Sequence, residues 1–332
     1  MTSVCPVTLD EVLRRRVHRH FLGAEKAPDV VALARRLGGL HAQVASSAQA
    51  AADLRMAGPP DLEKALWTDR TLVRTWAARG TLHLLPAEDL PIWVAAMSTR
   101  DRETKGSWLK YHGVTAEQMT DIFAALPDVL GGEPLTREEL AEAIIRATRH
   151  EDLRGPLTQG FGAILKPLAF RGLLCSGPPR GRNVTFVAPR AWLGEWEPVE
   201  TADAIDRLVR NYLGAYGPAG QDEFARWFDL RPPLAKRAFQ RVTSEMPEVP
   251  EEDTVRLLPA FDPYTIGVLR QLESVSSGPR AAVSRPQGWI SPVLLVNGRI
   301  EGTWEPGPVI TLFREQPDWV RKAIADLGSL GR

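Results

Sequence analysis

The chain has 332 residues, of which 44% are hydrophobic and 25% charged, values typical of folded globular proteins that argue against a disordered or membrane-embedded chain. The 41 Lys and Arg residues balance the 41 Asp and Glu residues, and this zero net charge argues against a protein that coats nucleic acid indiscriminately. Because no apolar run approaches the roughly 20 residues of a membrane span, and the start lacks a signal-peptide pattern, we expect a cytoplasmic protein with no membrane partner. Cys5 and Cys175 are too few for a disulfide framework or a four-thiolate zinc site, so we expect two reduced thiols.

The first part of the chain carries a helical pattern of apolar residues that ends in a short strand. Ser46 and Ser47 are suited to cap one helix, and Gly80 is suited to end another. Several helices followed by a strand outline a winged-helix unit, which we assign to residues 1–112. The expected helices cover 9–23, 28–43, 46–56 and 61–80, and the expected strand covers 81–86.

The same arrangement is predicted twice more. Residues 135–148 predict a helix that opens with a capping box, since Thr136 stands three residues before Glu139. A second helix, interrupted at Pro167, and a hairpin with a basic, turn-rich tip complete a second winged-helix unit, assigned to 113–198. A third unit within 199–250 is predicted to contain helices over 204–217, 219–230 and 232–246.

From residue 251 the pattern changes to short β-type runs. Asn297-Gly298 is a strong signal for a hairpin turn, whereas 274–288 is polar and without periodicity, which predicts a loop. Residues 317–328 predict a closing helix. The chain is therefore expected to be mainly α with β, with three winged-helix units followed by a small β domain over 251–332. The expected β runs cover 254–269, 288–306 and 309–315.

Standard catalytic signatures are missing from the sequence. It contains no glycine-rich phosphate loop, no His-Glu-x-x-His zinc helix and no Gly-x-Ser-x-Gly elbow, so we expect neither a cofactor nor a metal. His18 and His20 lie among arginines, without a cysteine or carboxylate cluster at ligand spacing. We interpret both as solvent-exposed or phosphate-facing side chains.

His41 and Gln43, in the stretch GLHAQVASS, form the most informative pair. On a regular helix, residues two apart point about 200° from each other, so both could line one cavity only where a helix ends or breaks. Gly38-Gly39 before the pair and Ser46-Ser47 after it supply such a break. Spacing alone still favours a core histidine and a solvated glutamine.

Four segments follow one another along the chain: GLHAQVASSAQAAADLR, LVRTWAARGTLHLLPAEDL, LLPAFDPY and GWISPVLLVNGRIEGTW. In this order they resemble the winged-helix DNA glycosylases of the AlkZ and YcaQ type. The resemblance implies three tandem winged helices and a β-barrel arranged as a C-shaped clamp. The family's catalytic motif is Gln, an apolar residue and Gln, and the matching tripeptide here is His41-Ala42-Gln43. A histidine thus replaces the first glutamine, as in a subgroup associated with self-protection against bulky DNA-alkylating natural products.

The resemblance implies that His41 and Gln43 are catalytic. A purine alkylated at N7 or N3 is cationic and leaves its deoxyribose without prior protonation, so the enzyme must stabilise the developing sugar cation and place a water. Gln43 can hold that water through its amide, and a histidine can also accept the water's proton. No lysine lies near the motif, which argues against Schiff-base lyase chemistry and for a monofunctional enzyme.

Further residues are candidates for contact with DNA. If Gly80 turns the chain from helix to strand, the polar residues around it could reach a DNA backbone; alternatively, they are solvated beside core leucines. Asp262, in PAFDPY, either supports the catalytic pair from behind or caps a turn, and the turn is the favoured reading. The candidates are Ser46 after the catalytic pair, Arg79, Thr81 and His83 around Gly80, Arg180 and Arg182 on the predicted wing, and Arg285 and Trp289 beside the predicted loop.

We therefore predict a DNA glycosylase that removes bulky N7- or N3-alkylpurines from duplex DNA, as a monomer without an obligate protein partner, in self-resistance against a DNA-alkylating natural product. The alternative is a non-enzymatic winged-helix DNA-binding regulator, or a protein that sequesters a drug. Alanine at His41 and Gln43 separates these hypotheses, since a regulator would tolerate the change. The stretch GFGAILKPLAFRG is too apolar for a base-reading recognition helix, which argues against the regulator.

Overall fold

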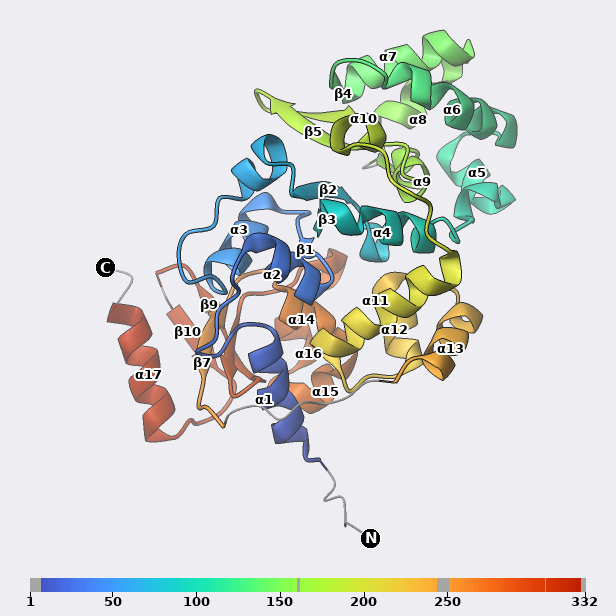
Figure 1. The fold of residues 1–332 in the computed structure, drawn as a ribbon. Coiled ribbons are helices and arrows are strands. Elements are labelled where there is room, and N and C mark those ends of the chain that lie inside the picture. The colour runs from blue at the N-terminus through green and yellow to red at the C-terminus, as the bar shows by residue number, and fades with distance from the viewer. Residues whose placement is uncertain (1–6, 160–161, 244–250, 308, 330–332) are drawn as a thin grey trace. The chain divides into compact units, whose positions relative to one another are not determined.

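The chain mixes helices with small antiparallel sheets, as Figure 1 shows. The structure is a computed structural model that describes residues 7–159, 162–243, 251–307 and 309–329. It divides into two compact units, of which the first comprises Met1–Pro60, Arg210–Glu223 and Thr243–Arg332, and the second Asp61–Val209 and Phe224–Val242. The four-part division expected from the sequence, its winged-helix character and the clamp stay predictions. None of the helices in the described part of the chain has the length and apolarity to cross a membrane.

The first unit opens with three predicted helices, now seen with their bounds. α1 (Leu9–Arg19) begins with a capping box between Thr8 and Glu11, and Asp29 caps α2 (Val30–Leu37). α3 (Ala45–Asp53) follows Val44, whose side chain makes no capping hydrogen bond. The expected serine cap is therefore wrong, because Ser46 already lies inside the first turn of the helix.

A four-stranded antiparallel sheet, in the order β10-β9-β8-β7, forms the C-terminal part of this unit. Asn297 and Gly298 have φ values of 48° and 85°, the two left-handed positions of a tight hairpin turn, which confirms the predicted turn. The predicted β-barrel is wrong for the described residues: β10 and β7 are the two edges of an open sheet, and small closed barrels take about eight strands. The strands are β7 (Val255–Leu258), β8 (Val293–Val296), β9 (Arg299–Glu305) and β10 (Val309–Leu312).

The chain between β7 and β8 is more helical than the sequence predicted. The expected β run over 254–269 ends at Leu258, and the stretch 274–288 carries short helical segments rather than an irregular loop. α17 (Asp318–Ser329) packs along the sheet, with Val320 clustered against Val255 and Leu294 (Figure 1). The short elements are α14 (Pro263–Gly267), a 3-10 turn (Leu269–Gln271), α15 (Leu272–Val275), α16 (Arg280–Val283) and a 3-10 turn (Pro286–Gly288).

One hydrophobic core of the first unit joins two parts that are distant in sequence. Leu13 and Val17 on α1 pack against Val293 and Leu295 on β8 and against Tyr264 on α14. The left-handed turn at Gly298 also approaches α1 so closely that a β-carbon there would lie 2.5 Å from the carbonyl oxygen of Leu13. The N-terminal helix is therefore built into the C-terminal β region.

The second unit begins with a hairpin where the sequence predicted a helix over 61–80. Only a π-helical turn (Lys64–Thr68) forms, and the chain then enters β2 (Leu72–Trp76), antiparallel to β3 (Leu82–Pro86). Arg70 adopts a left-handed φ of 54°, which ends the helical path. Val73, Thr75 and Trp76 are β-branched or aromatic and favour the strand, so pairing with β3 overrides the helical spacing.

The rest of the second unit follows the predicted order. The capping box between Thr136 and Glu139 opens α7 and is confirmed, as is the hairpin of β5 and β6, which extends a sheet in the order β4-β6-β5. Pro167 lies inside a short α9. The elements are α4 (Leu90–Met97), α5 (Gly106–His112), α6 (Ala116–Val129), β4 (Leu135–Thr136), α7 (Arg137–Thr148), α8 (Arg154–Thr158), α9 (Leu165–Phe170), β5 (Cys175–Arg180), β6 (Asn183–Val187), α10 (Pro189–Leu193), α12 (Gln221–Phe228) and α13 (Pro232–Arg241), with α11 (Thr201–Tyr216) and α12 crossing the unit boundaries.

Candidate functional site

The predicted catalytic pair lies at a break between α2 and α3. Gly38 ends α2 in the left-handed region with φ 65°, Gly39 follows with φ 94°, and Leu40–His41 form the short strand β1. The helix break expected from the two glycines is confirmed, so the pair escapes the opposed geometry of a regular helix. His41 is 7% exposed, whereas Gln43 is exposed. The imidazole is thus held inside the protein beside an accessible amide.

An aromatic row holds the ring of His41. The imidazole stacks on Phe261, with ring centroids 5.6 Å apart and planes at 15°. The Phe261 and Trp289 rings are T-shaped, with centroids 5.0 Å apart and planes at 77°. The backbone N–H of Phe261 also donates to the carbonyl of Ile290 at 3.4 Å. The row brings together His41 and Trp289, two residues singled out from the sequence. Trp289 remains 46% exposed at the outer end.

A buried ion pair fixes the segment that carries Phe261. Arg55, just after α3, donates to both carboxylate oxygens of Asp262 at 2.8 and 2.7 Å, and both side chains are fully buried. Arg55 also donates to the carbonyls of Ala51 and His20. A bidentate guanidinium–carboxylate pair is strongly directional, so it ties the end of α3 to the loop of Phe261.

Asp262 acts as a cap, the turn-capping role that the sequence favoured. It accepts from the backbone N–H of Tyr264 at 2.9 Å and begins α14. Phe261, directly before it, has a left-handed φ of 59°, which is unusual for a bulky residue and persists only where the surroundings enforce it. The cap and the ion pair therefore set the direction in which the Phe261 ring projects.

His20 is in the core, which corrects the expectation of an exposed or phosphate-facing side chain. Its ring is fully buried and lies edge-on to Tyr216 and Tyr264, with centroids 4.9 and 5.2 Å away. Burial, helped by the nearby charges of Arg55 and Arg16, lowers the pKa of His20 well below its usual range. The imidazole is therefore neutral. His18 pairs with Glu25 at 3.1 Å and is partly exposed.

The other predicted DNA contacts in the first unit are accessible. Ser46 is exposed in the first turn of α3, and Arg285 is exposed beside Trp289. The backbone N–H of Arg285 donates to the carbonyl of Trp289 at 2.9 Å, closing a tight turn with Gln287 and Gly288 at φ 63° and 79°. Arg285 and Trp289 thus lie on a compact turn.

The predicted contacts around Gly80 divide into accessible and buried residues. Arg79, at φ 55°, donates to the carbonyl of Trp227 at 3.1 Å, and Thr81 donates to the carbonyl of Ala78. Both remain partly exposed. His83 is only 2% exposed and its Nδ1 lies 2.9 Å from the carbonyl oxygen of Thr81. This burial leaves little imidazole surface for contact with a DNA backbone. We therefore no longer propose His83 as a DNA contact.

The predicted wing residues lie on the hairpin of the second unit. Arg180 and Arg182 are both exposed at its tip. Arg180 bonds to the Glu139 carboxylate at 2.7 Å and to the Pro134 carbonyl at 2.6 Å, so part of its charge is compensated. As contacts with DNA, both residues stay predictions.

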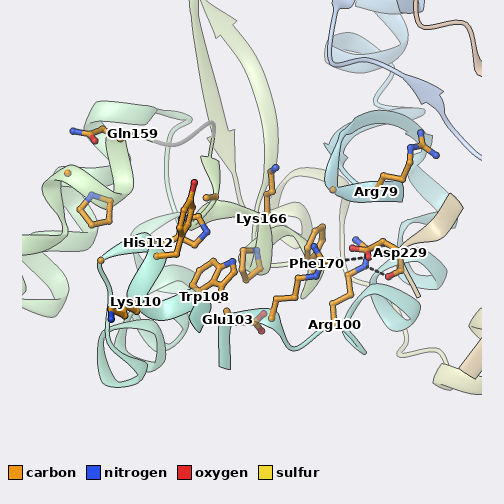
Figure 2. A pocket seen from close by; sticks show the side chains of 18 residues that line it. Arg79, Arg100, Glu103, Trp108, Lys110, His112, Gln159, Lys166, Phe170 and Asp229 are labelled. Carbon is orange, nitrogen blue, oxygen red and sulfur yellow. Dashed lines mark hydrogen bonds and ion pairs between the residues drawn. The ribbon is translucent and has the colours of Figure 1, made fainter. Parts of the chain in front are cut away.

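The second unit also holds a pocket of about 780 Å³, which Figure 2 shows from close by. It is lined by α5, α9 and the chain before α5, and among the residues proposed from the sequence only Arg79 lines it. Sequence reasoning missed this pocket, although the segment from Trp108 to His112, which places Lys110 among three ring-bearing side chains, was a usable signal.

No metal cluster or reactive thiol accompanies these sites in the described part of the chain. Three or more His, Cys, Asp or Glu side chains nowhere gather there as a metal would require. Cys175 is a buried free thiol, and burial raises its pKa. Cys5 lies outside the described residues. Cys175 is accordingly a core residue of the second unit.

Comparisons with known proteins agree on one family. The family model described as "DNA glycosylase AlkZ-like" matches residues 34–328. A Streptomyces sahachiroi protein named "Interstrand DNA cross-link repair glycosylase" is 35% identical over 323 residues, covering 89% of this chain and 87% of that protein. The solved structure of Streptomyces sahachiroi DNA glycosylase AlkZ matches with a TM-score of 0.86 and 31% identity, covering 98% of this chain and 96% of that one.

Proposed function

Because this chain belongs to the AlkZ-like DNA glycosylase family, and is thus a DNA N-glycosylase that acts on alkylation damage, we propose that it excises bulky N7- or N3-alkylpurines from duplex DNA as a monofunctional enzyme. Family membership favours this enzyme over the alternative of a regulator or a drug-sequestering protein. The observation that carries the proposal is the placement of a buried His41 beside an accessible Gln43 at a helix break.

The proposed chemistry divides between the two side chains. The alkylated purine already carries a positive charge, so its bond to the sugar breaks without a proton donor. Gln43 holds a water through its amide, and His41 accepts a proton from that water as it attacks the sugar carbon. General-base assistance of this kind is typically worth roughly 10²- to 10⁴-fold in rate. The products are the free base and an abasic site.

Phe261, Arg55 and Asp262 act as positioning residues in this proposal. The stack on Phe261 fixes the plane of the imidazole, and the buried ion pair fixes Phe261. A base catalyst is effective only when it lies within hydrogen-bond reach of the proton that it accepts. Holding the ring through packing helps to give His41 this constraint.

Two observations support the proposed substrate class: the name of a relative and the exposed ring of Trp289. The Streptomyces sahachiroi relative carries a name that says it repairs interstrand cross-links. We propose that this chain likewise accepts bulky adducts, whose aromatic scaffold can stack on the exposed face of Trp289. An enzyme with this range would protect a cell against its own DNA-alkylating natural product.

The test is incubation of the purified protein, with EDTA, on duplexes that carry one N7-methylguanine or one bulky N7-alkylguanine. Each reaction is divided, and one half is treated with mild alkali before electrophoresis. We expect strand breaks at the adduct only after alkali, because a monofunctional enzyme leaves an intact strand with an abasic site. Breaks without alkali would indicate lyase activity, and binding without breaks on either duplex would favour the regulator.

A further inference from the structure

The pocket of about 780 Å³ in the second unit is not lined by the proposed catalytic pair, and we propose that it binds an unpaired nucleotide of a DNA strand. The proposal rests on the proposed function of the chain as a DNA glycosylase. It adds a second site of contact with DNA, apart from the catalytic pair. Pockets of roughly 300 to 1,000 Å³ accept small organic ligands, so a nucleotide fits with room for its neighbours along a strand.

The first argument is charge. Two carboxylates line the pocket, and both are already paired: Asp229 with Arg102 at 2.6 Å, and the buried Glu103 with Arg171. Lys110 and Lys166 add two cationic side chains, and neither forms an ion pair with any residue that the structure describes. The pocket therefore carries a positive excess, which favours an anion.

Lys166 has a particular need for an anionic partner. Its side chain is half-buried, and burial together with the nearby charge of Arg102 lowers the pKa of the ammonium group. Lys166 lines the pocket (Figure 2), and its stem packs near Gly80. A phosphate placed here would relieve the repulsion between Lys166 and Arg102.

The second argument is a cluster of rings on one face of α5. Trp108, Tyr111 and His112 are three and four residues apart, and so they lie side by side on the helix. The centroid of His112 is 4.4 Å from that of Trp108 and 4.9 Å from that of Tyr111. Tyr111 is nevertheless 85% exposed, so most of its aromatic ring faces solvent and does not pack in a hydrophobic core.

The state of His112 suits stacking. Burial, and then the charge of Lys166, lowers the pKa of its imidazole, so the ring is neutral at pH 7. The imidazole plane is tilted by 56° to the Trp108 indole and by 88° to the Tyr111 phenol, so the rings form a cluster rather than one flat surface. The exposed phenol of Tyr111 is the ring that is open to a base, next to cationic side chains. This combination is the one that proteins use for unpaired nucleotides, with bases stacked on rings and phosphates on basic groups. A stacked base in a duplex has no free face to offer.

Other basic residues of the pocket serve the fold. Arg100 is buried, lies over the rings of Phe170 and Phe228, and donates to the carbonyls of Ala77 and Asp229. It is therefore unsuitable for a test, whereas Tyr111 and Lys110 are exposed and can be replaced without disturbing packing.

The experiment measures binding of a fluorescein-labelled oligothymidylate to the full-length protein by fluorescence anisotropy. We expect Tyr111→Ala to raise Kd about tenfold, the loss typical of one base–aromatic stack, and Tyr111→Phe, which keeps the ring, to bind like the wild type. Lys110→Ala combined with Lys166→Ala is expected to reduce the salt slope by about 1.4, or about 0.7 for each phosphate contact. Lys236→Ala, an exposed lysine on α13 outside the pocket, is the matched control and should change nothing.

Two further arms separate the outcomes. Competition with free dTMP distinguishes the sources of the nucleotide, and we expect the strand to resist millimolar dTMP; ready displacement would assign the pocket to free nucleotides instead. Equal binding by the wild type and Tyr111→Ala, or no binding of either ligand, would overturn the proposal. Base excision from an alkylated duplex is measured in parallel, so that a failed pocket is distinguishable from a failed glycosylase.

Discussion

The imidazole of His20 shows at the scale of one residue how burial alone changes the chemistry of a side chain. It lies edge-on to two tyrosines, and its pKa is lowered chiefly by desolvation. Because the folded protein keeps this histidine neutral while the unfolded chain titrates near ~6.5, the unfolded state binds more protons below that pH. Stability is therefore fully present above the unfolded value and is lost as pH falls below it.

This linkage predicts a pH-dependent stability that His20→Phe removes. Between pH 7 and pH 5, the wild-type free energy of unfolding is expected to fall by up to about 1.4 kcal/mol per pH unit below the unfolded pKa. The variant keeps a ring against the two tyrosines but has no proton to bind, so its curve should be flatter. Urea titrations over this range check the difference, and parallel curves for the two proteins would refute a buried neutral His20.

The ion pair between Arg55 and Asp262 gives a second prediction for single residues. Arg55→Met leaves the Asp262 carboxylate buried without its partner, and breaking such a pair typically costs about 3–5 kcal/mol. We expect a clear loss of thermal stability, measured by calorimetry. Arg55→Met with Asp262→Asn should recover part of the loss, because the uncompensated charge is gone. Arg14→Met, which breaks an exposed pair with Asp253, is the control and should cost little.

Sequence analysis could not identify the site residues whose contact partners lie far away along the chain. Arg55 and Asp262 are 207 residues apart, and nothing near either one in the sequence indicates the other. A similarly large separation along the chain conceals the stack of His41 on Phe261. His41 and Gln43 themselves could be proposed because a family resemblance and a local glycine pair pointed to them, and the helix break at those glycines is confirmed.

At the scale of elements, the hairpin at Asn297-Gly298 both turns a strand and contacts a helix. Gly298→Ala would place a β-carbon 2.5 Å from the Leu13 carbonyl oxygen at φ 85°. Gly307, at φ 107° in the turn between β9 and β10, is a matched control, since no described atom lies within 4 Å of its added β-carbon. Both alanines strain the backbone by about 1–3 kcal/mol, and only the first also displaces α1. We expect Gly298→Ala to lower the melting temperature more; equal losses would contradict the close approach of α1.

Sequence analysis predicted elements correctly where the sequence pattern that defines them is local. The capping box of Thr136 and Glu139 and the turn at Asn297-Gly298 each depend on residues within one turn, and both are confirmed. The helix predicted over 61–80 is wrong. The apolar spacing of this region suits a helix, but the pairing of β2 with β3 makes part of it a strand. The predicted barrel failed for a related reason, since strand runs do not show whether the edges of a sheet meet.

At the scale of the whole molecule, the balance of 41 basic and 41 acidic residues limits non-specific attraction to DNA. Binding to duplex DNA should depend on salt less steeply than for a basic DNA-coating protein. Ten neutralised phosphates would give a slope of about −9 in a plot of log K against log salt, and we expect a smaller magnitude. Equilibrium titrations of an undamaged duplex over a range of NaCl concentrations check this, and a slope near −9 would show that the charge balance is misleading.

The central claim is that His41 and Gln43 carry out base excision rather than DNA binding. The most direct test compares single-turnover excision of one N7-alkylguanine, with EDTA present, and Kd for the same duplex, in the wild type, His41→Ala, Gln43→Ala and the control His18→Ala. The account predicts unchanged Kd throughout, excision abolished in Gln43→Ala, a loss of roughly 10²- to 10⁴-fold in His41→Ala, and full activity in His18→Ala. Excision at the wild-type rate in either His41→Ala or Gln43→Ala, with DNA binding intact, would contradict it.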